Sequence, residues 1–130
     1  MDIRTSLPVV LLLDDEPNVT AGLKRALHSE PWKILTAATT GGAFDILSRE
    51  AVDVVVSDER MPGMSGSQFL SEVRKKHPHT IRMILSGQAD LEAAVRAINE
   101  GEVYRFLLKP CNPADLRITI RQALEHKQLV

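Results

Sequence analysis

Charged and hydroxyl side chains stand directly after short apolar runs at four separate places in the sequence. Clustered carboxylates repel one another unless a hard cation such as Mg2+ neutralises them, and a carboxylate can attack phosphorus as a nucleophile. A nearby ammonium and hydroxyl would then cover the transferring oxygens. Together these groups predict a divalent-cation site for phosphoryl transfer, with Asp58 as the nucleophile. The four groups are Asp14-Asp15-Glu16, Ser57-Asp58, Ser86-Gly87 and Lys109-Pro110.

Each group also has an ordinary structural explanation. Asp15 or Glu16 could support the N-terminus of a following helix. Asp58 and Ser86 could be turn or cap residues, and Lys109 could be a solvated charge at the sheet edge. All of these explanations must hold at once if no site exists. The coincidence of all four groups at strand ends therefore favours a site.

The apolar runs before these groups are short and lack strict alternation, which is typical of strands buried on both faces. They cover residues 9–13, 54–56, 81–85 and 106–108, with a weaker candidate at 34–37. Stretches with helical spacing separate them, so the order is (βα)5. This order predicts an α/β fold: an open, doubly wound, five-stranded parallel sheet of the flavodoxin-like three-layer kind, with strand order 2-1-3-4-5. Ligands bind beyond the carboxyl ends of such strands, where all four groups fall.

Punctuating residues predict where three of the helices begin. Pro17 suits the first position of the first helix, and Ser65 or Gly66 suits the start of the third. Asp90 stands at the start of the fourth helix. Residues 125–130 are either a terminus or the beginning of a linker.

Length and composition limit the kind of protein. A chain of 130 residues with 44% hydrophobic and 25% charged residues fits a single globular domain. The net charge of -1 provides no basic field for nucleic acid, and one cysteine, Cys111, excludes an internal disulfide. No apolar run approaches the ~18 residues of a membrane span, and residues 1–7 lack the apolar core of a secretory signal. We expect a cytoplasmic protein without direct nucleic-acid or membrane binding.

At four sites the sequence resembles the response-regulator receiver family of two-component signalling. The resemblance runs from about residue 8 to about residue 127, within a single domain expected over residues 1–130. Each motif is weak alone, whereas their order and spacing together are highly specific. The motifs are VVLLLDDE at 9–16, SDERMPGMSG at 57–66, LSG at 85–87 and FLLKP at 106–110.

The resemblance implies a phosphoacceptor and a metal site. Asp58 matches the residue that becomes phosphorylated. Asp15 matches a direct ligand of Mg2+ (or Mn2+), and Asp14 a ligand that acts through water. The main-chain carbonyl of Arg60 would complete the protein's share of the metal shell. Such a protein is a signalling domain and not an enzyme, because it catalyses only its own phosphorylation and dephosphorylation.

The resemblance also implies a switch. Ser86 matches the family's switch hydroxyl, Lys109 its phosphate-pairing lysine, and the Lys109-Pro110 peptide bond is a candidate for the cis isomer. Phe106 matches the aromatic residue that turns inward when the hydroxyl moves, although it lacks the hydroxyl of a tyrosine. Strand alternation predicts Tyr104 on the same side as Phe106.

Two further positions would tune the lifetime of the phosphoryl group. Arg60 and Gln88 each lie two residues beyond a site residue, where the family adjusts dephosphorylation. Glutamine could orient a water molecule, and arginine could pair with the phosphoryl group or shield it. The sequence does not give the sign of their joint effect.

The resemblance implies several partners. A sensor histidine kinase or a phosphotransfer protein would supply the phosphoryl group. The responding surface would comprise the fourth helix, fifth strand and fifth helix, and would control a homodimer or a covalently attached output domain if the chain is an N-terminal fragment. The stretches 58–64 and 101–106 look particularly like those of receivers joined to cyclic-dinucleotide phosphodiesterase modules or to transcriptional activators. The surface covers residues 90–100, 102–106 and 113–125.

Three other interpretations remain at this stage. A phosphohydrolase of the haloacid-dehalogenase type needs a second acid two residues after its nucleophile, where this chain has Arg60. A nucleotide-binding Rossmann or flavodoxin-like module would need a glycine-rich phosphate motif that is missing. An inert partner-binding domain would show no response to Mg2+ and a phosphodonor.

Overall fold

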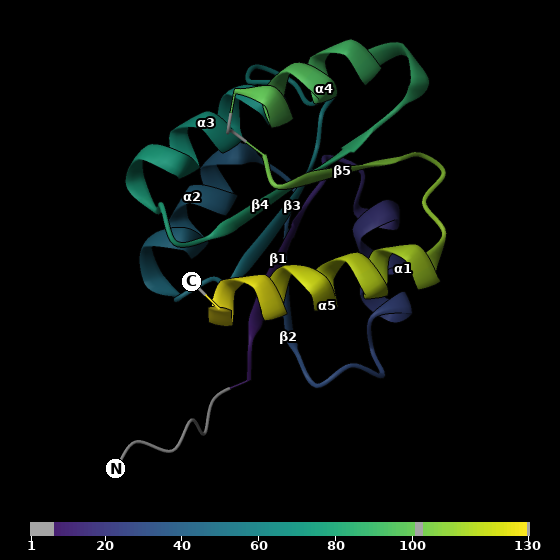
Figure 1. Cartoon of the computed structure of the whole chain (residues 1–130). Helices are drawn as coiled ribbons and strands as arrows, with labels where there is room; N and C mark the ends of the chain where they lie inside the picture. Colours follow the sequence, from purple (N-terminus) through teal and green to yellow (C-terminus); the bar gives the residue numbers. More distant parts are fainter. Residues whose placement is uncertain (1–6, 101–102, 130) are drawn as a thin grey trace.

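The structure, a computed structural model, describes residues 7–100 and 103–129. The predicted alternation of strands and helices is confirmed (Figure 1). A short 3-10 turn, η1 (Gln88–Asp90), precedes α4. The strands are β1 (Val9–Leu13), β2 (Lys33–Ala37), β3 (Val54–Asp58), β4 (Ile81–Ser86) and β5 (Arg105–Leu108), and the helices are α1 (Pro17–Ala26), α2 (Thr40–Arg49), α3 (Gly66–Lys76), α4 (Leu91–Asn99) and α5 (Pro113–Leu129).

The five strands form one parallel sheet in the order β2-β1-β3-β4-β5, as predicted. The register aligns the carboxyl ends of the central strands. Leu13 pairs with Ser57, Asp58 with Leu85, and Ser86 with Leu108. The residues that end or follow these strands therefore meet at one edge of the sheet.

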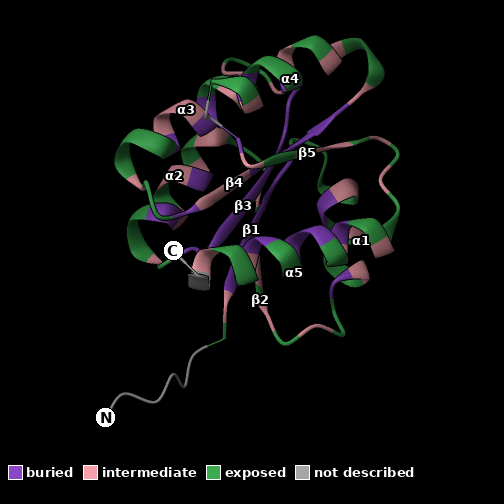
Figure 2. Cartoon of the chain, in the orientation of Figure 1, coloured by how far each residue is buried: buried purple, intermediate pink, exposed green. Residues whose placement is uncertain are grey.

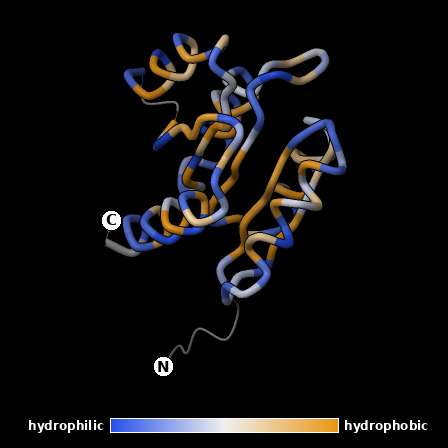
Figure 3. Tube along the Cα trace, turned by 90° about the vertical axis from the view of Figure 1, so that its right-hand side faces the viewer, coloured by the Kyte–Doolittle hydropathy of each residue, from blue (hydrophilic) through white to orange (hydrophobic). Residues whose placement is uncertain are grey.

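Helices cover both faces of the sheet, which gives three layers (Figure 1). Helices α1 and α5 pack on one face, and α2, α3 and α4 pack on the other. Successive residues of a strand point to opposite faces, so Leu11 joins one core and Leu12 the other. Apolar residues follow the central strands, whereas hydrophilic residues mark the outer sides of the helices (Figure 3).

Burial differs between central and edge strands (Figure 2). All residues of β1 and β3 are buried, which explains their continuous apolar runs. The expectation of burial on both faces is wrong for the run at 106–108, because β5 is an edge strand and Leu108 is 42% exposed. The weaker apolar signal at β2 has the same cause, since β2 forms the other edge.

The predicted helix starts are confirmed. Pro17 is the first residue of α1. Ser65 caps α3 through a reciprocal capping box with Gln68. Asp90 occupies the N-cap position of α4, although its side chain accepts no hydrogen bond from the helix backbone. Helix α5 continues to Leu129, beyond the predicted end of the responding surface.

The predicted side for Tyr104 is wrong. Phe106 packs against the core beneath α2, α3 and α4, whereas Tyr104 packs against the core on the α5 side and stacks on His126 at 5.1 Å. Strand β5 begins only at Arg105, so the alternation of a strand does not extend back to Tyr104. The predicted responding surface includes the range 102–106. Glu102, the first residue of that range, lies outside the described part of the chain.

The opposite end of the sheet has its own polar anchor. Asp53, just before β3, accepts a hydrogen bond from the Val9 amide at 2.8 Å. Its other carboxylate oxygen lies 2.8 Å from the Lys127 ammonium. The anchor therefore joins β1, β3 and the last turns of α5.

Among the described ranges, no helix combines the length and apolar character that a bilayer span requires.

Candidate functional site

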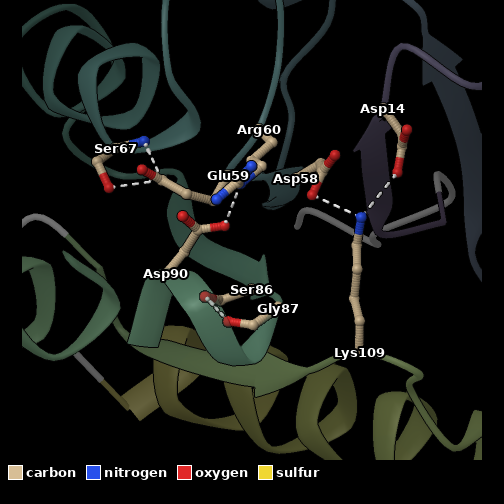
Figure 4. A network of polar contacts seen from close by, with 9 residues as sticks. All are labelled: Asp14, Asp58, Glu59, Arg60, Ser67, Ser86, Gly87, Asp90 and Lys109. Carbon is tan, nitrogen blue, oxygen red and sulfur yellow. Dashed lines mark hydrogen bonds and ion pairs between the residues drawn. The ribbon is translucent and has the colours of Figure 1, made fainter. Parts of the chain in front are cut away.

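The sequence-predicted side chains lie together at the carboxyl edge of the sheet (Figure 4). Asp14 directly follows β1, Asp58 ends β3, Ser86 ends β4 and Lys109 directly follows β5. Asp14, Asp58 and Ser86 are buried, and Lys109 is partly exposed. Strand packing fixes their backbones, so the fold holds these groups in place before any ligand arrives.

Three carboxylates form a group that could hold a metal ion. One oxygen each from Asp14, Asp15 and Asp58 lies within 4.8 Å of the others. Asp14 Oδ1 accepts a hydrogen bond from the Glu16 amide at 2.9 Å, whereas Asp14 Oδ2 is buried without a hydrogen-bond partner. A buried carboxylate oxygen without a donor is costly unless a cation compensates it. The donor set, all oxygen, fits Mg2+ or Mn2+.

Lys109 lies between two of these carboxylates (Figure 4). Its ammonium is 2.7 Å from Asp58 Oδ1 and 3.7 Å from Asp14 Oδ2. Burial lowers the pKa of Lys109, but the hydrogen bond and charge of Asp58, with the charges of Asp14 and Glu16, more than offset this, so the pKa is raised. Lys109 is therefore a firmly held cation next to Asp58. The peptide bond between Lys109 and Pro110 is cis.

Asp14 carries an electrostatic cost that favours cation binding. Burial raises its pKa above the ordinary value, and the neighbouring charges of Asp58 and Asp15 act in the same direction. The hydrogen bond from the Glu16 amide and the charge of Lys109 oppose the rise without cancelling it. A divalent cation at this position would relieve that cost.

The groups expected to switch lie beside the site. The Ser86 hydroxyl donates to the carbonyl of Gly87 at 3.0 Å, a contact within its own loop. Among the described residues, no hydrogen bond from Ser86 to Asp58 is present. Phe106 is partly buried against the core that includes Ala94 and Ala97 of α4. Within residues 7–100 and 103–129, the hydrogen bond of the serine hydroxyl therefore stays within its own loop.

Arg60 and Gln88 line different depressions of the surface. The Arg60 side chain turns toward Asp90, with Nε 2.8 Å from Oδ2. Arg60 and Asp90 line an open depression of about 550 Å3, and Asp15 lines it as well. Gln88 is exposed and lines a separate depression along the outer face of α4. Of Arg60 and Gln88, only Arg60 lines the depression that adjoins the acidic group.

The loop between β3 and α3 is held at both ends. The Glu59 carboxylate accepts hydrogen bonds from the amide of Ser67 at 2.9 Å and from its hydroxyl at 2.7 Å. The Gly66 amide donates to the Glu59 carbonyl at 2.9 Å. A Cβ at Gly66 would lie 2.2 Å from the Asp58 carbonyl oxygen. The start of α3 therefore rests directly on the end of β3.

Sequence reasoning missed two side chains of this region. Glu59 carries the loop clamp, and Asp90 pairs with Arg60 across 30 positions of the chain. For Asp90 the sequence offered only the signal of a helix start, since the contact depends on tertiary structure. For Glu59 a signal existed: it is an acid that directly follows a buried strand.

Comparisons with known proteins agree with the fold and the site. A family model described as the response regulator receiver domain matches residues 10–121. A solved receiver domain protein from Clostridium thermocellum superposes with a TM-score of 0.89 and is 34% identical, covering 95% of this chain and 98% of that one.

Two curated relatives are transcriptional regulators. The hydrogenase transcriptional regulatory protein HoxA of Cupriavidus necator is 39% identical over 120 residues, or 92% of this chain and 25% of HoxA. The transcriptional regulatory protein GlrR of Escherichia coli is 37% identical over 116 residues, or 89% of this chain and 26% of GlrR. The chain thus spans about a quarter of the length of these relatives. From its fold, its acidic edge and these matches, the chain belongs to the response regulator receiver domain family.

Proposed function

We propose that the chain receives a phosphoryl group on Asp58 from a histidine kinase or a phosphotransfer protein. One observation carries this proposal. The buried Asp58 carboxylate shares a cluster with two other acids and lies 2.7 Å from the Lys109 ammonium. We further propose that residues 1–130 form a single receiver domain with a core of about residues 8–127.

The same acids would hold a divalent cation. The carboxylates of Asp14, Asp15 and Asp58, with the main-chain carbonyl of Arg60, are the groups proposed to bind Mg2+ or Mn2+. The unpartnered Asp14 Oδ2 supports this assignment. A cation held there would supply positive charge that neutralises the phosphoryl oxygens.

The protein's side chains would carry out the transfer. An Asp58 carboxylate oxygen attacks phosphorus, and the bond from phosphorus to the donor breaks as the new O–P bond forms. The donor leaves with the electron pair of the broken bond. Lys109 stays within reach of the new phosphoryl oxygens, since it already contacts Asp58. Hydrolysis would reverse the state: water attacks the same phosphorus, the bond from phosphorus to the Asp58 oxygen breaks, and the free Asp58 carboxylate and inorganic phosphate are the products.

The phosphoryl group would act as a signal through Ser86. Its hydroxyl, now bonded to Gly87, turns to donate to a phosphoryl oxygen, and Phe106 moves inward to fill the space. A nearly complete switch requires the phosphorylated and unphosphorylated states to differ in preference by ~5 kcal/mol. New charge-assisted hydrogen bonds from Ser86 and Lys109 are of that order in sum.

The responding surface would be formed by α4, β5 and α5. We propose that it controls a homodimer or an attached output domain. The short span of this chain relative to HoxA and GlrR supports an output domain, and the names of those relatives favour a role in transcription. We propose that Arg60 and Gln88 adjust the rate of dephosphorylation. The role of Arg60 has the more direct support, because Arg60 lines the same depression as Asp15.

Intact-mass spectrometry tests the proposal. The chain is incubated with acetyl phosphate and MgCl2, with and without a chelator. Wild type should gain one phosphoryl group only with Mg2+, and Asp58→Asn should gain none. Asp45→Asn, the same change at an exposed acid on α2, serves as the matched control and should react like wild type. Absence of any gain, together with no binding of beryllofluoride, would refute the proposal.

A further inference from the structure

An ion pair at the mouth of the site joins the loop after β3 to the start of α4. Arg60 lies in that loop, and Asp90 directly precedes α4. Their side chains are 2.8 Å apart, with exposed fractions of 72% for Arg60 and 20% for Asp90. Figure 4 shows the Arg60 side chain directed toward Asp90. The pair therefore links the loop that borders Asp58 to a helix of the proposed responding surface.

Asp90 does not perform the task usual at its position. An aspartate at a helix N-cap normally accepts a hydrogen bond from the backbone of the first turn. The Asp90 side chain accepts none from α4, and Oδ2 is instead occupied by Arg60. An explanation of Asp90 as a simple helix cap therefore fails, and its described contact is with the guanidinium.

The same guanidinium belongs to the loop that directly follows Asp58, and Arg60 lines one depression together with Asp15 of the acidic group. The hydrogen bond and charge of Asp90 raise the pKa of Arg60 most, and the charge of Asp58 contributes in the same direction. A phosphoryl group on Asp58 would add ≈ -1.5 to -2 charges and strong acceptor oxygens at that side. The guanidinium of Arg60 would then have two anionic partners, the Asp90 carboxylate and the phosphoryl group, and the phosphoryl group would carry the larger negative charge.

We propose that Asp90 is a positioning residue that competes with the phosphoryl group on Asp58 for Arg60. In the unphosphorylated protein Asp90 holds the guanidinium turned toward α4. Phosphorylation draws the guanidinium to the phosphoryl oxygens, and the loop after β3 loses its tie to the start of α4. The proposal rests on the proposed function, because it requires an anion on Asp58.

Beryllofluoride provides the test, since it mimics a phosphoryl group by coordination to the acceptor carboxylate. Its affinity is measured by calorimetry at fixed MgCl2 for wild type, Asp90→Asn, Arg60→Gln and the double variant. Asp90→Asn should bind about two- to five-fold more tightly, the range that an exposed ion pair supports. Arg60→Gln should bind more weakly, and Asp90→Asn should have no further effect in the Arg60→Gln background.

Two control variants separate this mechanism from a general effect of removing a negative charge and from an effect of losing a helix cap. Glu92→Gln removes the same charge from an exposed position two residues further along the chain, and should leave the affinity near that of wild type. Asp90→Ser removes the charge but keeps a side chain that can cap a helix, and should repeat the effect of Asp90→Asn.

The possible results distinguish the two proposals. Equal tightening by Asp90→Asn in the presence and absence of Arg60, or no tightening at all, would overturn the competition while leaving the phosphoacceptor intact. Failure of wild type to bind beryllofluoride would overturn the proposed function, and the competition with it. Tightening that depends on Arg60 would establish Asp90 as acting through the guanidinium.

Discussion

Replacing Gly66 by alanine should disturb both the stability and the metal affinity of the site. The new Cβ would lie 2.2 Å from the Asp58 carbonyl oxygen and 2.9 Å from the Glu59 Cα. Both neighbours are backbone atoms, so no flexible side chain can move aside. The start of α3 and the end of β3 must therefore separate by more than an ångström to restore an ordinary contact.

The size of the effect follows from this geometry. Overpacking of a well-packed region costs about 1–3 kcal/mol, and we expect the upper half of that range because backbone must move. For a domain of this length each kcal/mol lowers the melting temperature by roughly 3–6 °C. The same movement displaces the Asp58 carboxylate relative to Asp14 and Asp15, so we expect Mg2+ affinity to fall about tenfold or more.

Urea unfolding with and without MgCl2 measures both effects, because a ligand of the folded state adds stability in proportion to its affinity. Gly41→Ala is the matched control. Gly41 lies in α2, and its added Cβ would meet no atom within 4 Å. That variant should gain about 0.4–1 kcal/mol and keep its response to Mg2+. The reasoning is refuted if Gly66→Ala unfolds within ~0.5 kcal/mol of wild type with an unchanged Mg2+ response.

Two further predictions concern the charges around Asp58. Because the pKa of Asp14 is raised, the folded protein keeps this proton to higher pH than the unfolded chain, so ionisation of Asp14 reduces stability as pH rises through that interval. Bound Mg2+ requires the ionised form, so calorimetry at successively lower pH should show the Mg2+ affinity starting to decline above the ordinary pKa of an aspartate, and a flat profile would contradict the assignment. Lys109→Met removes an ammonium 2.7 Å from Asp58, so Mg2+ should bind several-fold more tightly while acetyl phosphate reacts about tenfold more slowly. Weaker Mg2+ binding in calorimetry would show that Lys109 organises the site and does not compete with the cation.

The architecture was predictable because each part of it leaves a local trace. Buried parallel strands give continuous apolar runs, and the polar residue that ends each run marks the functional edge of the sheet. Asp14, Asp58 and Lys109 could therefore be placed together from the order of residues alone. Their proximity required only the rule that parallel strands point the same way.

The remaining features depend on tertiary structure. Tyr104 was placed on the wrong side because the start of β5 could not be located from the sequence, and alternation holds only inside a strand. The pairing of Arg60 with Asp90 spans 30 positions and leaves no periodic signal. The exposure of Leu108 reflects the edge position of β5, which the apolar character of the run did not indicate.

The polar anchor at the far end of the sheet sets a practical limit for dissecting the protein. Lys127 supplies an ammonium 2.8 Å from the buried Asp53, and that carboxylate also receives the Val9 amide. Any excised version that stops before Lys127 would remove this ammonium from an acid that is buried in the fold. A recombinant fragment intended for isolated study should therefore retain at least one residue beyond His126, even though the proposed phosphorylation site lies at the other end of the strands.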